Sequence, residues 1–260
     1  MKKLSGQTIA GLFLAALTSL VVVPAGAQNA EVKEKAPLYT YVSNWDIPRA
    51  HWADMAKDKT GTAKILDREI ANGTIVGYGS NESVVHSPKG PTHGTWWCAM
   101  SMAGVLNPLD ELSRSGLTVN PVLAGATGHW DTILVSRFYD WRPGTVKAGY
   151  VHGSVYQLKA DAPNDAVEVI SKSLIVPLFE KLMAEGTVQA YQIAEEGIHS
   201  MDPDQFFVYY LTPKAEGLDK VNAALSAAIR ADSLAAPAFS SMVDFSQHRD
   251  ELSRNDSTFK

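Results

Sequence analysis

The chain carries the same passage twice. Residues 69–86 and 182–199 align without a gap at one constant offset. The identical pairs include Gly73/Gly186, Thr74/Thr187, Tyr78/Tyr191, Glu82/Glu195, His86/His199 and, one position further on, Ser87/Ser200. A duplication of this length predicts two structural units of the same kind that pack against each other.

A second repeated sequence element lies at the end of each repeat and sets the expected domain boundaries. The elements His129-x-Asp131 and His248-x-Asp250 are each followed a few residues later by Ser-Arg. The second repeat is therefore expected to run almost to the C-terminus. The expected division is a linker at 28–37, a first repeat at 38–131, a second repeat at 132–254 and a free tail at 255–260.

Hydrophobic periodicity predicts the order strand, helix, strand, strand, helix in both repeats. In the first repeat the expected strands are 38–43, 74–85 and 95–102, and the expected helices are 48–72 and 107–112. In the second repeat the expected strands are 132–138, 187–198 and 205–211, and the expected helices are 164–182 and 218–229, with a longer excursion at 141–156. Gly73 and Gly186 are each expected to end the first helix of their repeat, since glycine favours the left-handed C-cap.

Each repeat would form a ferredoxin-like antiparallel sheet with helices on one face. The other face is expected to carry apolar residues: Tyr39, Tyr41, Trp96, Cys98, Ile133, Val135 and Phe207. Neither repeat can bury this face alone, so two repeats are expected to stack sheet on sheet as a barrel. The fold class is therefore α+β, with two β-α-β-β-α repeats forming one intrachain α/β barrel.

By topology and duplication, the chain after residue 27 resembles a tandem member of the dimeric α/β-barrel superfamily. This superfamily includes antibiotic-biosynthesis-type monooxygenases, NIPSNAP-like proteins, muconolactone isomerases and chlorite-dismutase-like haem proteins. The resemblance implies a fold and a cavity. It transfers no catalytic residue, because no motif specific to one family is present.

The first 27 residues have the pattern of a Sec-type signal peptide. Lys2 and Lys3 precede an apolar run at 9–23, and the small residues at 25–27 form a cleavage site. An uncleaved membrane anchor is the alternative, but the run is short compared with the ~20 apolar residues of a span. The mature chain is expected to begin near Gln28, in the periplasm or outside the cell, with no membrane contact after cleavage.

Charge and composition exclude several partners. The formal net charge is −5, and the lysines and arginines form no basic stripe, which argues against nucleic-acid binding. The single cysteine, Cys98, lies in an apolar run and is expected to be a buried, inert thiol. Because each repeat already has a partner within the chain, a monomer with pseudo-two-fold symmetry is expected.

Histidines and acids at repeated positions are the candidate catalytic groups. The candidates are His86, His199, His129, Asp131, His248 and Asp250. In each hairpin a Glu and a His lie four residues apart, so on a strand they would face the same way. Joined by the His-x-Asp elements, they could form an acid/base pair or a metal ligand set. The alternative is that duplication copied structural residues that satisfy backbone groups.

Repeated tyrosines and glutamates are the candidate ligand-binding residues. They are Tyr78, Tyr191, Glu82 and Glu195. Aromatic residues near them could line a cavity for an apolar or planar ligand, or they could simply fill a core. No nucleophile elbow, phosphate loop, dinucleotide fingerprint or Cys-x-x-Cys motif is present. No cofactor and no bound metal are expected.

Three functions remain open on these grounds. The leading hypothesis is an exported barrel that binds a small apolar or aromatic ligand between its two halves. The first alternative is a cofactor-independent monooxygenase or isomerase that uses a repeated His with Asp or Glu. The weaker alternative is metal or haem binding, with His199 or His86 as the axial haem ligand. An enzyme site is expected to be asymmetric, because one half usually specialises.

Overall fold

The computed structural model describes residues 32–87, 90–117, 121–200, 202–231 and 235–260. The expected signal peptide at 1–27 and the first part of the expected linker lie outside the described residues. Within the described ranges, no helix is both long enough and apolar enough to cross a membrane.

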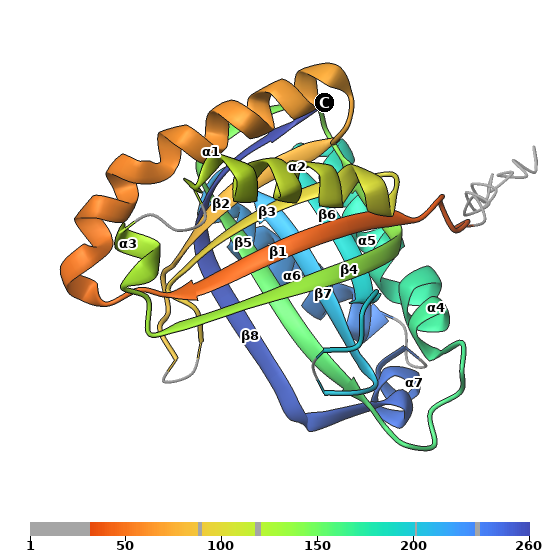
Figure 1. Ribbon diagram of the computed structural model, residues 1–260. Helices are drawn as coiled ribbons and strands as arrows, with labels where there is room; N and C mark the ends of the chain where they lie inside the picture. Colours follow the sequence, from red (N-terminus) through yellow and green to blue (C-terminus); the bar gives the residue numbers. More distant parts are fainter. Residues whose placement is uncertain (1–31, 88–89, 118–120, 201, 232–234) are drawn as a thin grey trace, which may run out of the picture. The chain divides into compact units, whose positions relative to one another are not determined.

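Eight strands close into one antiparallel barrel (Figure 1). In chain order they are β1 (Leu38–Asp46), β2 (Gly77–Ser83), β3 (His93–Ala99), β4 (Gly128–Trp141), β5 (Gly144–Leu158), β6 (Ala190–Glu196), β7 (Gln205–Thr212) and β8 (Val243–Phe259). Around the barrel the order is β1-β3-β2-β8-β5-β7-β6-β4, and β4 pairs with β1 to close it. Because the barrel is closed, each strand has a paired neighbour on both sides.

The strand order around the barrel consists of two sets, and adding four to each strand number of the first set gives the second set. Strands β4, β1, β3 and β2 lie side by side, and β8, β5, β7 and β6 continue the barrel in the corresponding order. Residues 144–158, most of which are expected from the sequence to form an excursion without a strand, form β5 and stand where β1 stands in the first set. That prediction is wrong because exposed and glycine-rich positions break the apolar alternation along β5.

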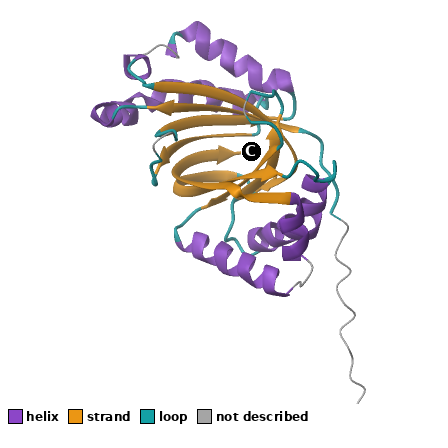
Figure 2. Ribbon diagram, turned by 90° about the horizontal axis from the view of Figure 1, so that it is seen from below, coloured by secondary structure: helices purple, strands orange, loops and turns teal. Residues whose placement is uncertain are grey.

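The helices pack outside the barrel in two groups on opposite sides (Figure 2). The first group holds a 3-10 turn at Arg49–His51, α1 (Trp52–Asn72), α2 (Met102–Ser115) and α3 (Pro121–Ala124). The second group holds α4 (Ala166–Ile170), a π-helical turn at Ser171–Ile175, α5 (Val176–Ala184), α6 (Glu216–Ala231) and α7 (Ala235–Met242). The predicted α+β class is confirmed at this level.

Glycines end the first helical segment of each group as the duplication predicts, since α4, the π-helical turn and α5 follow one another without a break. Gly73 follows α1 with φ of 78°, and Gly186 follows α5 with φ of 75°. Helix α2 begins earlier than expected, because the Ser101 hydroxyl accepts a hydrogen bond from the Gly104 backbone N–H at 3.1 Å. This serine caps the first turn, so the predicted start at Asn107 is wrong.

The C-terminal residues belong to the barrel and are not a free tail. Asn255 and Phe259 are buried, and β8 pairs with β2 along this whole stretch. The Lys260 backbone N–H donates to the Val76 carbonyl at 3.0 Å. The prediction for 255–260 is wrong because polar residues such as Ser257 face a barrel interior that is itself partly polar.

Each strand contributes to two cores, one under the helices and one inside the barrel. Trp96, Cys98 and Phe207 lie inside, as expected for the inner sheet face. The other residues predicted for that face lie on the outer side of β1 and β4: Tyr39, Tyr41, Ile133 and Val135. A shift of one residue along a strand exchanges the two faces, and that shift is the error here.

Truncation after Arg254 tests the role of the last strand segment. It removes the buried Phe259 side chain and the pairing of β8 with β2. We expect the free energy of unfolding to fall by at least about 3–5 kcal/mol, the usual cost of losing one buried Phe side chain. Urea unfolding followed by circular dichroism measures this loss, and an unchanged midpoint would contradict closure by β8.

Candidate functional site

A repeated hydrogen bond ties the helices to the sheet in both halves of the barrel. Tyr78 of β2 donates to a carboxylate oxygen of Asp67 in α1, and Tyr191 of β6 donates to Glu180 Oε1 in α5 at 2.6 Å. Donor and acceptor are 11 residues apart in both pairs. The two tyrosines predicted as ligand-binding residues therefore reach toward the helices. A site that used them would lie between helix and sheet.

The first half has a pocket at this level, with a volume of about 170 Å³. Helix α1 contributes Met55, Ala63 and Leu66, and the sheet contributes Trp45, Tyr78, Ser80 and Thr95. Residues from α3, β5 and β8 complete the lining: Leu123, Lys147 and Thr258. The helix side is apolar, whereas the sheet side carries several hydroxyl groups.

The corresponding space in the second half is filled. The pairings of β2 with β3 and of β6 with β7, together with the repeated tyrosine bonds, relate each pocket residue to its counterpart. The related pairs are Ala63/Val176, Leu66/Phe179, Ser80/Ile193 and Thr95/Val208. All four second-half residues are buried in the core under α4, α5 and α6. Each is bulkier or more apolar than its first-half counterpart, so these positions form no matching pocket in the second half. A hollow of about 290 Å³ in that half opens beside α4 instead, at Phe138, Val167 and Ile193.

Hydroxyl groups on the sheet side are available to a ligand. Among the described residues, the Ser80 and Thr95 side chains have no hydrogen-bond partner. Burial, with the hydrogen bond to Asp67, raises the pKa of Tyr78 to about 12. The phenol therefore stays protonated at neutral pH. Such a pocket suits a mainly apolar molecule with one or two polar atoms on its sheet-facing edge.

A second hollow, of about 120 Å³, lies inside the barrel. It lies between the two sets of strands, where a ligand is expected from the sequence. Trp96 and Trp141 contribute aromatic surface, and the Thr40 hydroxyl donates to Gln192 Oε1 at 3.2 Å within the lining. No described histidine lines either hollow.

The His-x-Asp element on β4 meets a serine and an aromatic ring of β1. His129 Nε2 lies 3.0 Å from Asp131 Oδ1 and 3.0 Å from Ser43 Oγ, and the imidazole stacks on Trp45 with centroids 3.6 Å apart. A serine–histidine–acid relay needs the serine and the acid on different ring nitrogens. Both lie at Nε2 here, so the cluster does not activate Ser43 as a nucleophile.

The second His-x-Asp element, on β8, contacts residues of β5 that correspond to those on β1, but its hydrogen bonds differ. Ser154 donates directly to Asp250 Oδ1 at 2.7 Å, and His248 Nε2 lies 3.2 Å from the same oxygen. The His248 ring stacks on Tyr156 with centroids 4.5 Å apart. His152 Nε2 lies 3.8 Å from Asp250, and burial lowers the pKa of His152. Because Ser154 bonds the carboxylate itself, no relay forms here either.

The predicted Glu–His pairs do not share a strand face. His86 and His199 lie beyond the ends of β2 and β6, the strands that carry Glu82 and Glu195. The His86 ring stacks instead on Trp52 of α1, with centroids 5.0 Å apart. The His-x-Asp elements contact β1 and β5 rather than these hairpins. The four-residue sets expected from the sequence therefore do not assemble among the described residues.

The histidines suggested as haem ligands lie away from the two hollows described above. His86 and His199 line neither the barrel hollow nor the pocket under α1. His199 borders a separate groove, whose lining mixes charged residues such as Glu195 and Asp202 with apolar residues such as Leu158. Among the described residues, no group of three or more His, Cys, Asp or Glu side chains is placed to hold a metal ion.

Comparison with solved structures identifies the fold. A proposed monooxygenase from Lactobacillus acidophilus NCFM superposes with a TM-score of 0.63 at 12% identity, over 85% of this chain and 94% of that chain. A proposed monooxygenase from Fusobacterium nucleatum gives 0.57 at 6% identity, over 87% and 95%. An anthrone oxidase-like protein gives 0.52 at 8% identity, over 85% and 92%. The chain thus has the dimeric α/β-barrel fold that its sequence resembles.

No protein-family model matches the chain, and no curated protein sequence matches it. At the identities above, structural likeness establishes the fold alone.

The expectation that no cofactor is involved needs correction. The similar structures include chlorite dismutases, which bind haem, with a TM-score of 0.48 at 12% identity in one case. The fold therefore gives no reason to expect that a cofactor is absent. Likeness at that level assigns no haem to this chain, whose candidate axial histidines lie away from both hollows.

Stability at alkaline pH tests the environment of Tyr78. The pKa of this phenol rises from 10.0 to about 12 on folding, so the folded state holds the proton more tightly than the unfolded state. This contribution is fully present below pH 10 and is lost as the pH rises through 12. We expect the free energy of unfolding to fall over this range, and to fall less in Tyr78→Phe. Urea unfolding at each pH, with tyrosinate absorbance as a second readout, measures the difference; equal slopes would show that Tyr78 is not desolvated beside Asp67.

Proposed function

We propose that the chain is an exported small-molecule-binding protein whose ligand lies in the pocket between α1 and the sheet of the first half. One observation carries this proposal. Four positions that fill the second half with Val, Phe, Ile and Val hold Ala, Leu, Ser and Thr in the first half. A void left by chance costs stability without a return, whereas a pocket that holds a ligand recovers the lost contacts.

The lining indicates a planar, mainly apolar ligand with a hydroxyl or carbonyl group. Trp45 and Leu66 provide apolar walls, and the unpaired hydroxyls of Ser80 and Thr95 can donate to or accept from one polar edge. An engineered apolar cavity of ~150 Å³ admits benzene. A pocket of about 170 Å³ therefore suits one ring or two fused rings.

Oxidation of such a ligand is a second candidate function. Two similar folds are proposed monooxygenases and a third is anthrone oxidase-like, which supports an oxygenase on the same scaffold. The asymmetric pocket contains the Tyr78 phenol, which donates its proton to Asp67 and whose oxygen can accept a hydrogen bond from a ligand hydroxyl. Uptake of dioxygen after ligand addition separates this function from binding alone.

A double substitution that copies the second half into the first tests the binding site. In Ser80→Ile/Thr95→Val, the first half acquires the two sheet residues that fill the second half. We expect the affinity for 2-naphthol to fall by at least tenfold, because the pocket is filled and both free hydroxyls are lost. The free energy of unfolding should stay the same or rise by about 1 kcal/mol as apolar surface is buried. Naphthol fluorescence titration and urea unfolding measure the two effects.

The reciprocal variant is the matched control. Ile193→Ser/Val208→Thr makes the same exchange in the second half, where no ligand is expected. It should lower the free energy of unfolding by about 2 kcal/mol or more while leaving naphthol affinity unchanged. Equal naphthol binding by the wild-type protein and the filled variant would overturn the proposal. Dioxygen uptake by the wild-type protein alone would favour the oxygenase.

We further propose that the chain is a signal-directed, tandem monomer. The n-region, apolar run and small-residue cleavage site support export. The strand order, which repeats with a difference of four, supports repeats at 38–141 and 144–259 rather than the division at 131/132 expected from sequence. Expression of the full chain in a bacterial host should yield periplasmic protein that starts near Gln28 and elutes as a monomer. N-terminal sequencing checks the cleavage site, and light scattering checks the oligomeric state. A cytoplasmic protein that still begins with Met1 would refute export, and a stable dimer would refute the monomer.

A further inference from the structure

Three aromatic rings inside the barrel lie over glycines of neighbouring strands. A Cβ atom at Gly79 would come within 2.7 Å of the Trp96 ring, and one at Gly153 within 2.6 Å of the Tyr209 ring. Phe259 covers Gly77 in the same way, at 2.6 Å. None of these glycines has the positive φ that would require glycine for backbone reasons. These positions hold glycine because aromatic rings occupy the space in which a side chain would lie.

This arrangement keeps the barrel axis open. A ring that lies over a glycine rests against the wall, whereas a Cβ at that position would push the ring toward the centre. Protein interiors are normally packed with few voids larger than a water molecule. Here a hollow of about 120 Å³ remains, and Trp96, Tyr209 and Phe259 all line it.

Packed side chains lie on two sides of the hollow. On one side, Leu134, Val155 and Phe207 form a buried cluster. On the other, Trp141 is held in place through its Nε1, which donates to the Lys260 carbonyl at 2.9 Å.

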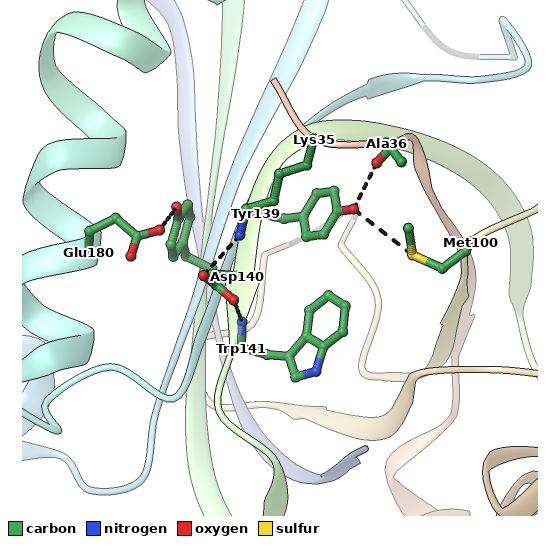
Figure 3. A network of polar contacts seen from close by, with 8 residues as sticks. Lys35, Ala36, Met100, Tyr139, Asp140, Trp141 and Glu180 are labelled. Atoms are coloured by element: carbon green, nitrogen blue, oxygen red, sulfur yellow. Dashed lines mark hydrogen bonds and ion pairs between the residues drawn. The ribbon is translucent and has the colours of Figure 1, made fainter. Parts of the chain in front are cut away.

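The segment around Trp141 is braced from outside the barrel (Figure 3). The Trp141 backbone N–H donates to Asp140 Oδ1 at 2.8 Å, and Lys35 binds the same carboxylate at 2.9 Å. Tyr139 beside it donates to the Ala36 carbonyl at 2.7 Å and stacks on Trp141 with centroids 5.6 Å apart. These contacts hold the Trp141 part of the aromatic wall in place from outside the hollow.

Polar groups in the lining retain hydrogen-bonding capacity. Asn255 Nδ2 donates to Asn81 Oδ1 at 2.7 Å, and Asn81 faces the hollow. Asn255 does not itself line the hollow; it is 2% exposed, and its Oδ1 has no hydrogen-bond partner among the described residues. The Glu251 carboxylate also lies on the lining, which disfavours an anionic occupant.

We propose that the barrel interior is a second binding site, for a neutral single-ring aromatic molecule that carries a hydroxyl group. The ring of the ligand stacks against the aromatic residues of the wall. Its hydroxyl group forms hydrogen bonds with the side-chain amides of Asn81 and Gln192. The hollow is smaller than the ~150 Å³ cavity that admits benzene, so two fused rings are excluded and slight adjustment of the lining admits phenol. This site is independent of the pocket under α1.

Phenol titration of the Ser80→Ile/Thr95→Val protein tests the proposal, since that background closes the pocket under α1. We expect a dissociation constant on the order of 0.1–1 mM, as for a ligand of so few atoms. Saturation-transfer NMR reports the bound ring, and the melting temperature should rise with phenol concentration. Benzoate, which matches the ring but carries a charge, should bind at least tenfold more weakly.

Gly153→Ala is the decisive variant, because the new methyl group meets only the Tyr209 ring and turns it into the hollow. Phenol binding should fall at least tenfold. Gly128→Ala is the matched control, since a Cβ there meets its neighbours at an ordinary 3.5 Å. If Gly153→Ala does not fold, Ala190→Leu fills the hollow from another strand. Phenol binding unchanged in the hollow-filling variant, or absent from the starting protein, would overturn the proposal. Loss of naphthol binding with retained phenol binding separates the two sites.

Discussion

Closure of the barrel is the constraint on which the rest of the structure depends. Each strand is paired on both edges, and strands such as β1 and β7 are covered on both faces, by helices on one and by the barrel interior on the other. Every residue of a strand therefore has a defined neighbour. Polar residues such as Thr40 and Asn255 are accommodated inside because they bond other lining residues. The interior thus combines ring stacking with amide hydrogen bonds.

The two halves divide stability and recognition between them. The second half packs Phe179, Ile193 and Val208 into a continuous core. The first half keeps the tyrosine–acid bond that anchors α1, and it replaces much of the surrounding bulk with smaller or hydroxylated side chains. An apolar core under one helix layer can support a pocket under the other, because both layers rest on the same barrel.

Sequence alone predicts the duplicated features well where the cause is local. Gly73 and Gly186 end helices because the left-handed turn requires glycine, and Tyr78 and Tyr191 occupy corresponding positions. Assignment of strand faces fails for Tyr41, because both faces of a closed barrel are buried and alternation no longer separates core from solvent. The pocket under α1 has no sequence motif. Its signal is a difference between aligned repeats, at Ser80 against Ile193 and Thr95 against Val208, which becomes visible only when the strand register relates the positions.

The position of β8 also has a kinetic consequence. Ser80 and Asn255, which are bonded across the seam between β2 and β8, are 175 residues apart. During synthesis, β2 therefore waits with one unpaired edge until nearly the whole chain has emerged, while β1, β3 and β4 can already associate. Contacts of such sequence separation slow folding, and an unpaired edge invites pairing with other chains. The hydrogen-bond ladder that seals the finished barrel is thus the last to form, and the unfinished chain is the state most in need of protection from self-association.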